Sequence, residues 1–197
     1  MLDGPDQASI PDMPPQTAAG KVLWHFSMTL DGFIAGPDHS MEWMTGFTGR
    51  EGIIDEYAST TGAILGGRDG WDAFPDASLT YGGAWSGPTF VLTHHPGDAA
   101  PAAGVTFLDC EVAEALRIAK EASAGKNVEV FSASIGRQLL ELGLIDEIDL
   151  HIAPVLLGDG VRLYDNPGGR PVPLSLVNGD AGRVEVNLRY VPVRPGS

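Results

Sequence analysis

The chain has 197 residues, of which 43% are hydrophobic and 19% are charged, so it can bury a substantial core and is not disordered as a whole. At about 150 residues per domain, a single domain is the default expectation. Acidic residues number 26 against 12 lysines and arginines, and the resulting net charge of -14 disfavours nucleic acids and anionic membranes as partners.

Cys110 is the single cysteine, which excludes an intrachain disulfide and a multi-cysteine zinc site. No apolar run reaches the ~18 residues that a membrane-spanning helix needs. The first 20 residues lack the apolar centre of a signal peptide. We therefore expect a cytoplasmic protein without a bound metal.

The ends of the chain differ in composition from the middle. Residues 1–20 combine four prolines with three aspartates and are predicted to be an acidic, proline-rich leader. Residues 21–191 are predicted to form one domain, followed by a tail over residues 192–197.

Between these ends, strand-like and helix-like patterns alternate. Strands are predicted, in chain order, over Val22–Phe26, Ala63–Leu65, Thr89–Leu92, Val105–Leu108, Val128–Phe131 and Glu147–Ala153. Helices are predicted over Glu51–Thr60, over Glu111–Ala122 with Asp109 as its cap, and after Ser134 as a cap. Leu174–Val177 and Val184–Tyr190 resemble a closing antiparallel hairpin around Asn178-Gly179-Asp180.

Repeated strand–helix–strand units predict an α/β fold, in which a largely parallel sheet carries helices on both faces. Ligands of such sheets bind beyond the carboxyl ends of the strands. The turns that follow the predicted strands are therefore the first places to look for function.

Three of these turns have the chemistry to bind an anion. In the first, Gly67, Arg68, Asp69 and Gly70 join a strand to a predicted helix, where glycines expose amides and arginine adds a cation. The second holds Thr93, His94 and His95. The third runs through Ser132, Ala133, Ser134, Ile135, Gly136 and Arg137 onto another helix. Each turn alone is also compatible with a simple structural role, but three on one edge would suit an extended phosphate-bearing ligand.

Other polar and aromatic residues allow two interpretations each. Asp31 forms an Asp-Gly turn after the first strand, or it contacts a ligand at the mouth of the site. Trp43 belongs to the core or to a pocket wall. Glu51 and Asp55 are candidates by position for a substrate-orienting acid, although a solvated helix face is the simpler interpretation. The histidines His25 and His151 lie within strands and are expected to be packed and hydrogen-bonded.

Four segments together resemble a known family. FSMTLDGFIAGPDHSMEWM, ILGGRDGWDAF, FVLTHHP and LLELGLIDEIDLHIAPVLLGDGVRLYD occur in the order seen in the dihydrofolate-reductase-like family. Within it, the chain is similar to the branch of the riboflavin-biosynthesis reductase domain and its stand-alone bacterial relatives. The resemblance spans about residues 21–190 and is most specific over Leu139–Tyr164.

The resemblance implies a three-layer α/β sandwich with a mostly parallel sheet of about eight strands and a C-terminal antiparallel hairpin. It implies NADPH as cofactor and hydride transfer to a pteridine-like or ribosylaminopyrimidine-like small molecule. By this resemblance, the turns at Gly67–Gly70, Thr93–His95 and Ser132–Arg137 meet the cofactor phosphates, the adenosine ribose phosphate and the pyrophosphate. Asp31 and Trp43 are the expected catalytic residues, with Asp31 near the nicotinamide and substrate.

The chain also departs from the family pattern. Ser132 and Ala133 stand where two glycines are usual, and Asp69 stands where a hydroxyl is common. These departures keep open an alternative, namely a binding protein of the same fold whose cofactor use is lost or altered. A third possibility is an interaction role through the apolar strand at Ile148–Val155, and we expect a homodimer.

Overall fold

The computed structural model describes residues 13–47, 49–177 and 189–190. The chain divides into two compact units. One unit, Gln16–Asp165, contains every helix and strand of the described residues. The other comprises Met1–Pro15 and Asn166–Ser197, and its described residues form neither helix nor strand.

The elements of the Gln16–Asp165 unit alternate as the sequence pattern predicts. The strands are β1 (Val22–Thr29), β2 (Phe33–Ala35), β3 (Thr61–Gly67), β4 (Thr89–Leu92), β5 (Val105–Leu108), β6 (Asn127–Phe131), β7 (Glu147–Ala153) and β8 (Val161–Arg162). The α-helices are α1 (Ile53–Thr60), α2 (Arg68–Ala73), α3 (Val112–Ala122) and α4 (Ala133–Glu141). Short 3-10 helices are η1 (Pro37–His39), η2 (Glu42–Met44), η3 (Ala77–Gly83) and η4 (Pro96–Asp98).

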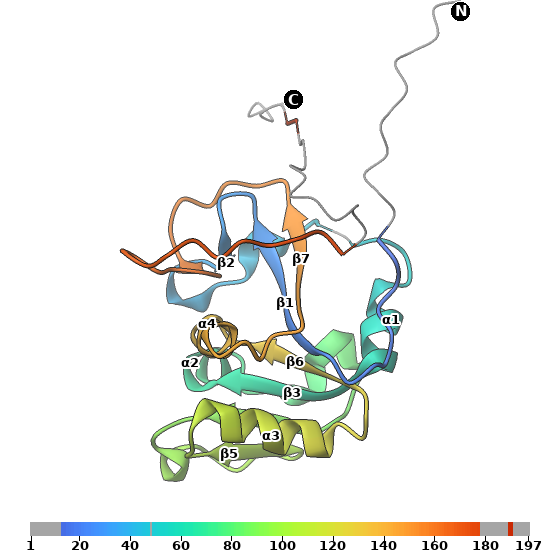
Figure 1. Cartoon of the computed structure of the whole chain (residues 1–197), viewed down its shortest axis with the longest axis vertical. Coiled ribbons are helices and arrows are strands. Elements are labelled where there is room, and N and C mark those ends of the chain that lie inside the picture. Colours follow the sequence, from blue (N-terminus) through green and yellow to red (C-terminus); the bar gives the residue numbers. More distant parts are fainter. Residues whose placement is uncertain (1–12, 48, 178–188, 191–197) are drawn as a thin grey trace, which may run out of the picture. The chain divides into compact units, whose positions relative to one another are not determined.

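Six of the strands form one sheet in the order β5-β4-β3-β6-β1-β7, and every neighbouring pair in it is parallel (Figure 1). The strands β2 and β8 form a separate antiparallel pair. The predicted α/β class with a mostly parallel sheet is therefore confirmed. Parallel neighbours need crossover connections, which the helices between the strands supply.

One face of the sheet carries the apolar core. Val22 and Trp24 of β1 lie on this face with Leu65 of β3 and Val130 of β6, and all four are buried. The helices α3 and α4 cover them through side chains at helical spacing, namely Val112, Ala115, Leu116, Ala119, Ile135 and Leu139. Because these positions recur every three or four residues, each helix presents one apolar stripe to the sheet.

Helix α4 approaches the sheet closely at Gly136. A Cβ on Gly136 would lie 2.1 Å from the Trp24 ring. The Trp24 indole N–H donates to the carbonyl of Ser132 at 3.2 Å, which holds the start of the helix against β1. This glycine therefore fixes the height of the α4 N-terminus above the sheet.

We expect Gly136→Ala to lower the free energy of unfolding by roughly 1–3 kcal/mol, because a methyl group overpacks the contact with Trp24. Chemical denaturation followed by tryptophan fluorescence measures the change. Gly70→Ala is the matched control, since nothing lies within 4 Å of a Cβ on Gly70. Equal stability of the two variants would contradict the close approach.

The opposite face of the sheet is unusually polar. His25 of β1 and Glu129 of β6 are buried there, against Tyr57 of α1 and Tyr81 of η3. The alternation of side chains along a strand separates this face from the apolar one, since His25 and Glu129 each neighbour a core residue in the sequence. The two faces therefore bury different chemistry.

Both predicted helix caps differ from those in the structure. The N-cap of α3 is Glu111, without a side-chain hydrogen bond, whereas the predicted Asp109 lies 3.8 Å from His94 Nδ1. The N-cap of α4 is Ser132, whose hydroxyl accepts from the Ile135 amide, rather than Ser134. The N-cap of α4 directly follows β6, which ends at Phe131, whereas two residues separate β5 from the N-cap of α3.

The terminal segments fall only partly within the described residues. Leu174–Val177, predicted as a strand, has no regular structure, and residues 178–188 of the predicted hairpin lie outside the described part. Residues of the predicted leader contact the sheet: the Gln16 side chain donates to Asp149 Oδ2 at 2.8 Å, and Asn127 Nδ2 donates to the Thr17 carbonyl at 2.8 Å.

Among the described residues, no helix has the length and apolar character to cross a bilayer.

Candidate functional site

Three turns meet at the carboxyl edge of the sheet. The strands β4, β3 and β6 are consecutive neighbours, and all three run in the same direction. Their last pairs are Gly67 with Leu92 and Gly66 with Phe131. The strands therefore end at nearly the same height, and the segments that follow them lie side by side.

The turns after β3 and β6 touch each other. A Cβ at Gly67 would lie 2.9 Å from the Ser132 hydroxyl oxygen, so a side chain at this position would displace that hydroxyl. The absence of a side chain here allows the two turns to close up. The result is a continuous rim from the start of α2 to the start of α4.

Arg68 links the turn after β3 to the turn after β4. Its Nη1 donates to the carbonyl of His95 at 3.3 Å, and its Nε donates to Asp72 Oδ1 at 2.6 Å. Asp72 is exposed, and surface ion pairs of this kind contribute only about 0–1 kcal/mol. An anion of higher charge at this rim would therefore compete effectively for the guanidinium group.

The turn after β4 is folded by Thr93. The Thr93 hydroxyl is buried and accepts from the His95 amide at 3.1 Å, while the Thr93 amide donates to Leu108 at 2.9 Å. His94 and His95 are exposed. His94 Nδ1 lies 3.8 Å from Asp109 Oδ1, and the backbone carbonyl of His95 accepts from Arg68.

The turn after β6 presents the N-terminus of α4. The amides of Ala133 and Ser134 belong to the first turn of the helix and have no intrahelical acceptor. The hydroxyls of Ser132 and Ser134 lie 3.3 Å apart beside them. Ile135 and Gly136 are buried beneath this turn, and Arg137 pairs with Glu141 at 2.5 Å. Amides, hydroxyls and the helix dipole together favour an anion here.

Asp31 organises the loop beyond β7. Its carboxylate accepts from the Thr29 hydroxyl at 2.6 Å, from the Leu157 amide at 3.1 Å and from the Gly158 amide at 2.8 Å. The hydrogen bond from Thr29, with those from the two amides, lowers the pKa of Asp31 to about 2. The Asp-Gly turn and the loop after β7 are thus tied together by one ionised carboxylate.

This lowered pKa gives a pH dependence with a definite sign. The folded pKa lies below the ordinary value of 3.8, so the contribution of Asp31 is present above pH 3.8 and is lost as the pH falls through about 2. We expect Asp31→Asn to melt at a lower temperature than the parent chain at pH 7, with a difference that shrinks between pH 4 and pH 2.5. The exposed Asp98→Asn is the control, and a difference that does not vary with pH would contradict the assignment.

The other predicted residues lie apart from the rim or are exposed. Trp43 is half-buried on η2, and its indole N–H has no hydrogen-bond partner among the described residues. Glu51 and Asp55 are exposed, as expected for a solvated helix face. Asp69 is exposed in the first turn of α2 and forms part of the rim.

The polar face of the sheet holds titratable residues that the sequence interpretation missed. Glu129 accepts from the hydroxyls of Thr61 and Tyr81, and the Tyr57 hydroxyl donates to Asp149. Burial, reinforced by Asp149, raises the pKa of Tyr57, and burial with Glu129 raises that of Tyr81, so both phenols remain donors. The signal was present in the sequence as one charged residue, Glu129, within an otherwise apolar strand.

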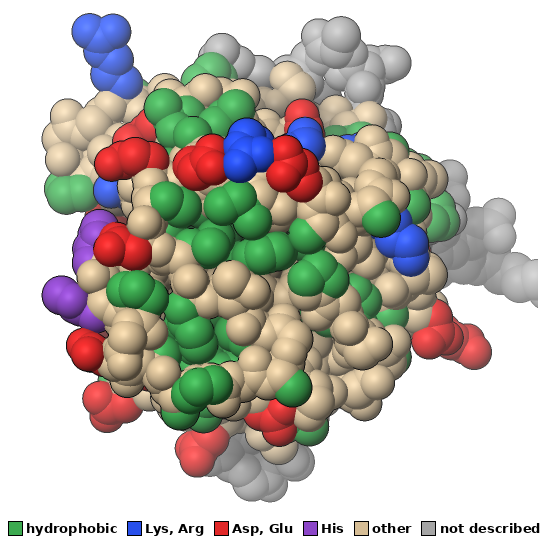
Figure 2. Space-filling model, turned by 90° about the horizontal axis from the view of Figure 1, so that it is seen from below, with side chains coloured by type: hydrophobic (Ala, Val, Ile, Leu, Met, Phe, Trp, Pro, Cys, Tyr) green, Lys and Arg blue, Asp and Glu red, His purple; other side chains and the backbone are tan. Residues whose placement is uncertain are grey.

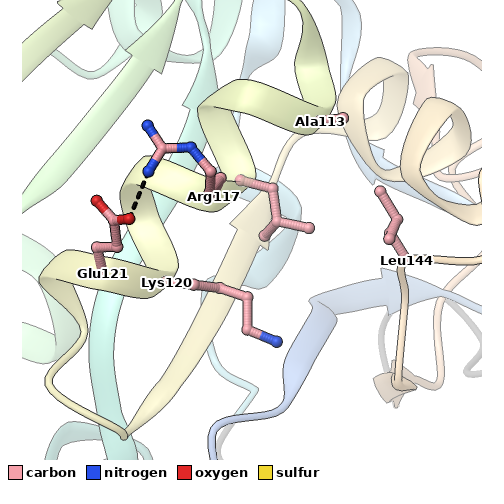
Figure 3. Close-up of a pocket in the computed structure, with 6 residues that line it drawn as sticks. Ala113, Arg117, Lys120, Glu121 and Leu144 are labelled. Atoms are coloured by element: carbon pink, nitrogen blue, oxygen red, sulfur yellow. Dashed lines mark hydrogen bonds and ion pairs between the residues drawn. The ribbon is translucent and has the colours of Figure 1, made fainter.

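A shallow groove lies elsewhere, on the α3 side. Figure 3 shows its lining residues, with Lys120 and Leu144 on either side and an ion pair between Arg117 and Glu121. On the face seen from below, Figure 2 shows hydrophobic side chains beside a row of acidic and basic ones. None of the rim residues lines the groove.

Within the described residues, no cluster of three or more His, Cys, Asp or Glu side chains is arranged to hold a metal.

Solved structures with this fold come from several bacteria. A putative riboflavin biosynthesis protein from Shewanella sp. PV-4 superposes with a TM-score of 0.60 at 19% identity, over 76% of this chain and 86% of that one. Dihydrofolate reductase from Enterococcus faecalis, complexed with NADP(H) and RAB-propyl, gives 0.54 at 16% identity, over 76% and 80%.

A third structure is the diaminohydroxyphosphoribosylaminopyrimidine deaminase/5-amino-6-(5-phosphoribosylamino)uracil reductase of Thermotoga maritima. It superposes with a TM-score of 0.55 at 16% identity, over 77% of this chain and 50% of that one. At these identities the three structures establish the shared fold. The sequence itself matches the RibD C-terminal domain family over residues 20–182, which includes all three turns and Asp31. The chain therefore belongs to the RibD C-terminal domain family.

Proposed function

We propose that this chain is an NADPH-dependent reductase that transfers a hydride to a pteridine-like or ribosylaminopyrimidine-like small molecule. The observation that carries the proposal is the single rim formed by the turns after β4, β3 and β6. Family membership supports it, as do the Enterococcus faecalis enzyme complexed with NADP(H) and the Thermotoga maritima protein named as a reductase.

The residues at the rim fit a dinucleotide. The free amides of Ala133 and Ser134 suit a pyrophosphate, because the first turn of α4 has no other use for these donors. Gly67 lets the neighbouring backbone approach closely. Arg68 supplies a cation, and His94 and His95 supply ring N–H groups, for a further phosphate such as the one that distinguishes NADPH from NADH.

The cofactor would supply the hydride, and the chain would bind, orient and exclude water. Asp31 would act by holding the loop at Leu157 and Gly158 in place beside the site. The indole N–H of Trp43 is buried without a hydrogen-bond partner among the described residues, so an acceptor atom of a substrate that reached it would satisfy it. Trp43 is thus the proposed catalytic residue that contacts the substrate, and Asp31 is a positioning residue that holds the loop.

A second function is favoured by one specific feature of the rim. Ser132 and Ala133 stand where the family usually has two glycines, and the Ser132 hydroxyl already caps the Ile135 amide. A binding protein of the same fold, with lost or altered cofactor use, would tolerate side chains at this point. The proposal therefore needs a test that separates binding from its absence.

Titration with NADPH, followed by quenching of tryptophan fluorescence, provides this test. We expect saturable binding in the range of about 1 μM to 1 mM, with NADH binding more weakly. Dihydrofolate and 5-amino-6-(5-phosphoribosylamino)uracil serve as trial substrates, with oxidation of NADPH as the signal. Absence of saturation at millimolar NADPH would reject the reductase and favour the binding protein.

A further inference from the structure

A row of three titratable side chains crosses the polar face of the sheet. Glu129 of β6, His25 of β1 and His151 of β7 follow one another on adjacent strands. Glu129 Oε2 lies 3.0 Å from His25 Nδ1, and His25 Nε2 lies 2.8 Å from His151 Nε2. The row is continuous, and the hydride-transfer chemistry proposed above leaves it without a role.

The buried end of the row fixes the position of its protons. Glu129 is fully buried and accepts from the hydroxyls of Thr61 and Tyr81. Because both hydroxyls donate to Glu129, its carboxyl oxygens act as acceptors, and the remaining contact is a hydrogen bond when His25 Nδ1 carries the hydrogen. His25 is also held by stacking on the Tyr57 ring, with centroids 4.1 Å apart, so its orientation is fixed.

The link between the two imidazoles accommodates one hydrogen. If both Nε2 atoms carried hydrogen, the two N–H groups would face each other at 2.8 Å, and if neither did, the contact would join two lone pairs. With His25 Nδ1 already protonated, the pair can hold one extra proton while keeping this bond. In that state His25 is cationic beside Glu129 and donates to His151 Nε2, and His151 carries its hydrogen on Nδ1.

The open end of the row is His151 Nδ1. No described residue forms a hydrogen bond with this atom, and His151 is only partly buried. The register places His151 opposite Ser27, while Trp24 is opposite Val130. His151 therefore lies past the end of β6, level with the start of α4. Across the sheet it is two strands, or about 10 Å, from the rim.

We propose that Glu129, His25 and His151 form a proton relay whose open end, His151 Nδ1, donates the proton that accompanies hydride transfer. The inference rests on the proposed reductase function. As the hydride bonds to an electrophilic carbon of the substrate, the π-electron pair of its C=N or C=O bond moves to the nitrogen or oxygen. That atom takes the proton from His151 Nδ1, the proton on His25 Nε2 moves to His151 Nε2, and solvent later restores one proton.

The charged and titratable groups around His151 determine the pH range in which the His25–His151 pair holds its extra proton. Its own strand contributes Asp149, β1 contributes His25, and β6 contributes Glu129, to which Tyr81 of η3 donates. From α1 and the loop before it come Tyr57, Glu56 and Arg50. Burial and the neighbouring His25 lower the pKa of His151. Because the delivering form carries the extra proton, turnover should fall as the pH rises.

Nitrogen NMR of the histidine rings in the intact chain tests the relay without any substrate. We expect His25 and His151 to take up one proton together over a single pH interval, with His151 Nδ1 exchanging with solvent. Glu129→Gln should move this interval to lower pH. Independent titration of the two rings in the parent chain would overturn the relay, and that measurement requires no variant to fold.

Kinetics with NADPH and dihydrofolate or the phosphoribosylaminouracil then tests donation. We expect His151→Asn to lower kcat by at least about 100-fold and to remove its pH dependence, with the dissociation constant of NADPH unchanged. His39→Asn, outside the relay and the rim, is the control. An unchanged kcat and pH profile in His151→Asn would overturn the inference and leave the reductase standing. If the parent chain fails to bind NADPH, the reductase function is rejected. The NMR titration of the two rings still tests whether His25 and His151 share one proton.

Discussion

Replacing Glu129 by alanine is expected to lower the free energy of unfolding by about 3–5 kcal/mol, because each buried donor left without an acceptor costs roughly 1–3 kcal/mol. Glu129 is fully buried and accepts hydrogen bonds from Thr61, Tyr81 and His25. In the variant these donors stay buried and lose their acceptor. Urea unfolding at pH 7, followed by circular dichroism, measures the loss.

Glu121→Ala is the matched control for this experiment. Glu121 is exposed on α3 and pairs only with Arg117 in the described part of the chain, so its loss should cost less than about 1 kcal/mol. A variant at Glu129 that is as stable as the one at Glu121 would show that the polar face of the sheet is hydrated. It would contradict the buried network described here.

The second large effect is expected at the N-terminus of α4. Ser134→Asp should weaken NADPH binding by about 100-fold, because two like charges about 4 Å apart repel by up to roughly 4 kcal/mol near a protein surface. The free protein should not lose stability, since a carboxylate in the first turn of a helix interacts favourably with its dipole. Isothermal titration calorimetry gives the affinity, and a thermal melt gives the stability.

Ser134→Asn separates charge from size at the same position. It adds a comparable side chain without the negative charge, so we expect a much smaller loss of affinity. If the asparagine and aspartate variants bind NADPH equally well, the phosphates do not lie near the first turn of α4. The proposed placement of the pyrophosphate would then be wrong.

Much of the fold could be predicted from local patterns in the sequence. The apolar runs at Thr89–Leu92 and Val105–Leu108 and the alternating segment Glu147–Ala153 have the predicted bounds. Helix α3 likewise spans Val112–Ala122, one residue shorter than the predicted Glu111–Ala122. The crossover rule then placed the three turns at one edge, because parallel strands joined by helices end on the same side.

The details that depend on pairing between distant segments could not be predicted from the sequence. Ser132 and Ser134 are both good helix caps, and the choice between them follows from where β6 ends against β3. The contact between Glu129 and His25 requires β6 and β1 to be neighbours in the sheet, and their residue types alone do not specify this. Nor does the Asp-Gly turn at Asp31 reveal that its carboxylate binds amides at Leu157 and Gly158.

Amide hydrogen exchange with and without saturating NADPH tests the central claim most directly, because it reports on the three turns separately in one experiment. The account predicts slower exchange in all three segments, residues 66–70, 93–95 and 132–137, with little change at α3. Unchanged exchange in all three segments, or protection confined to the groove between α3 and Leu144, would contradict it.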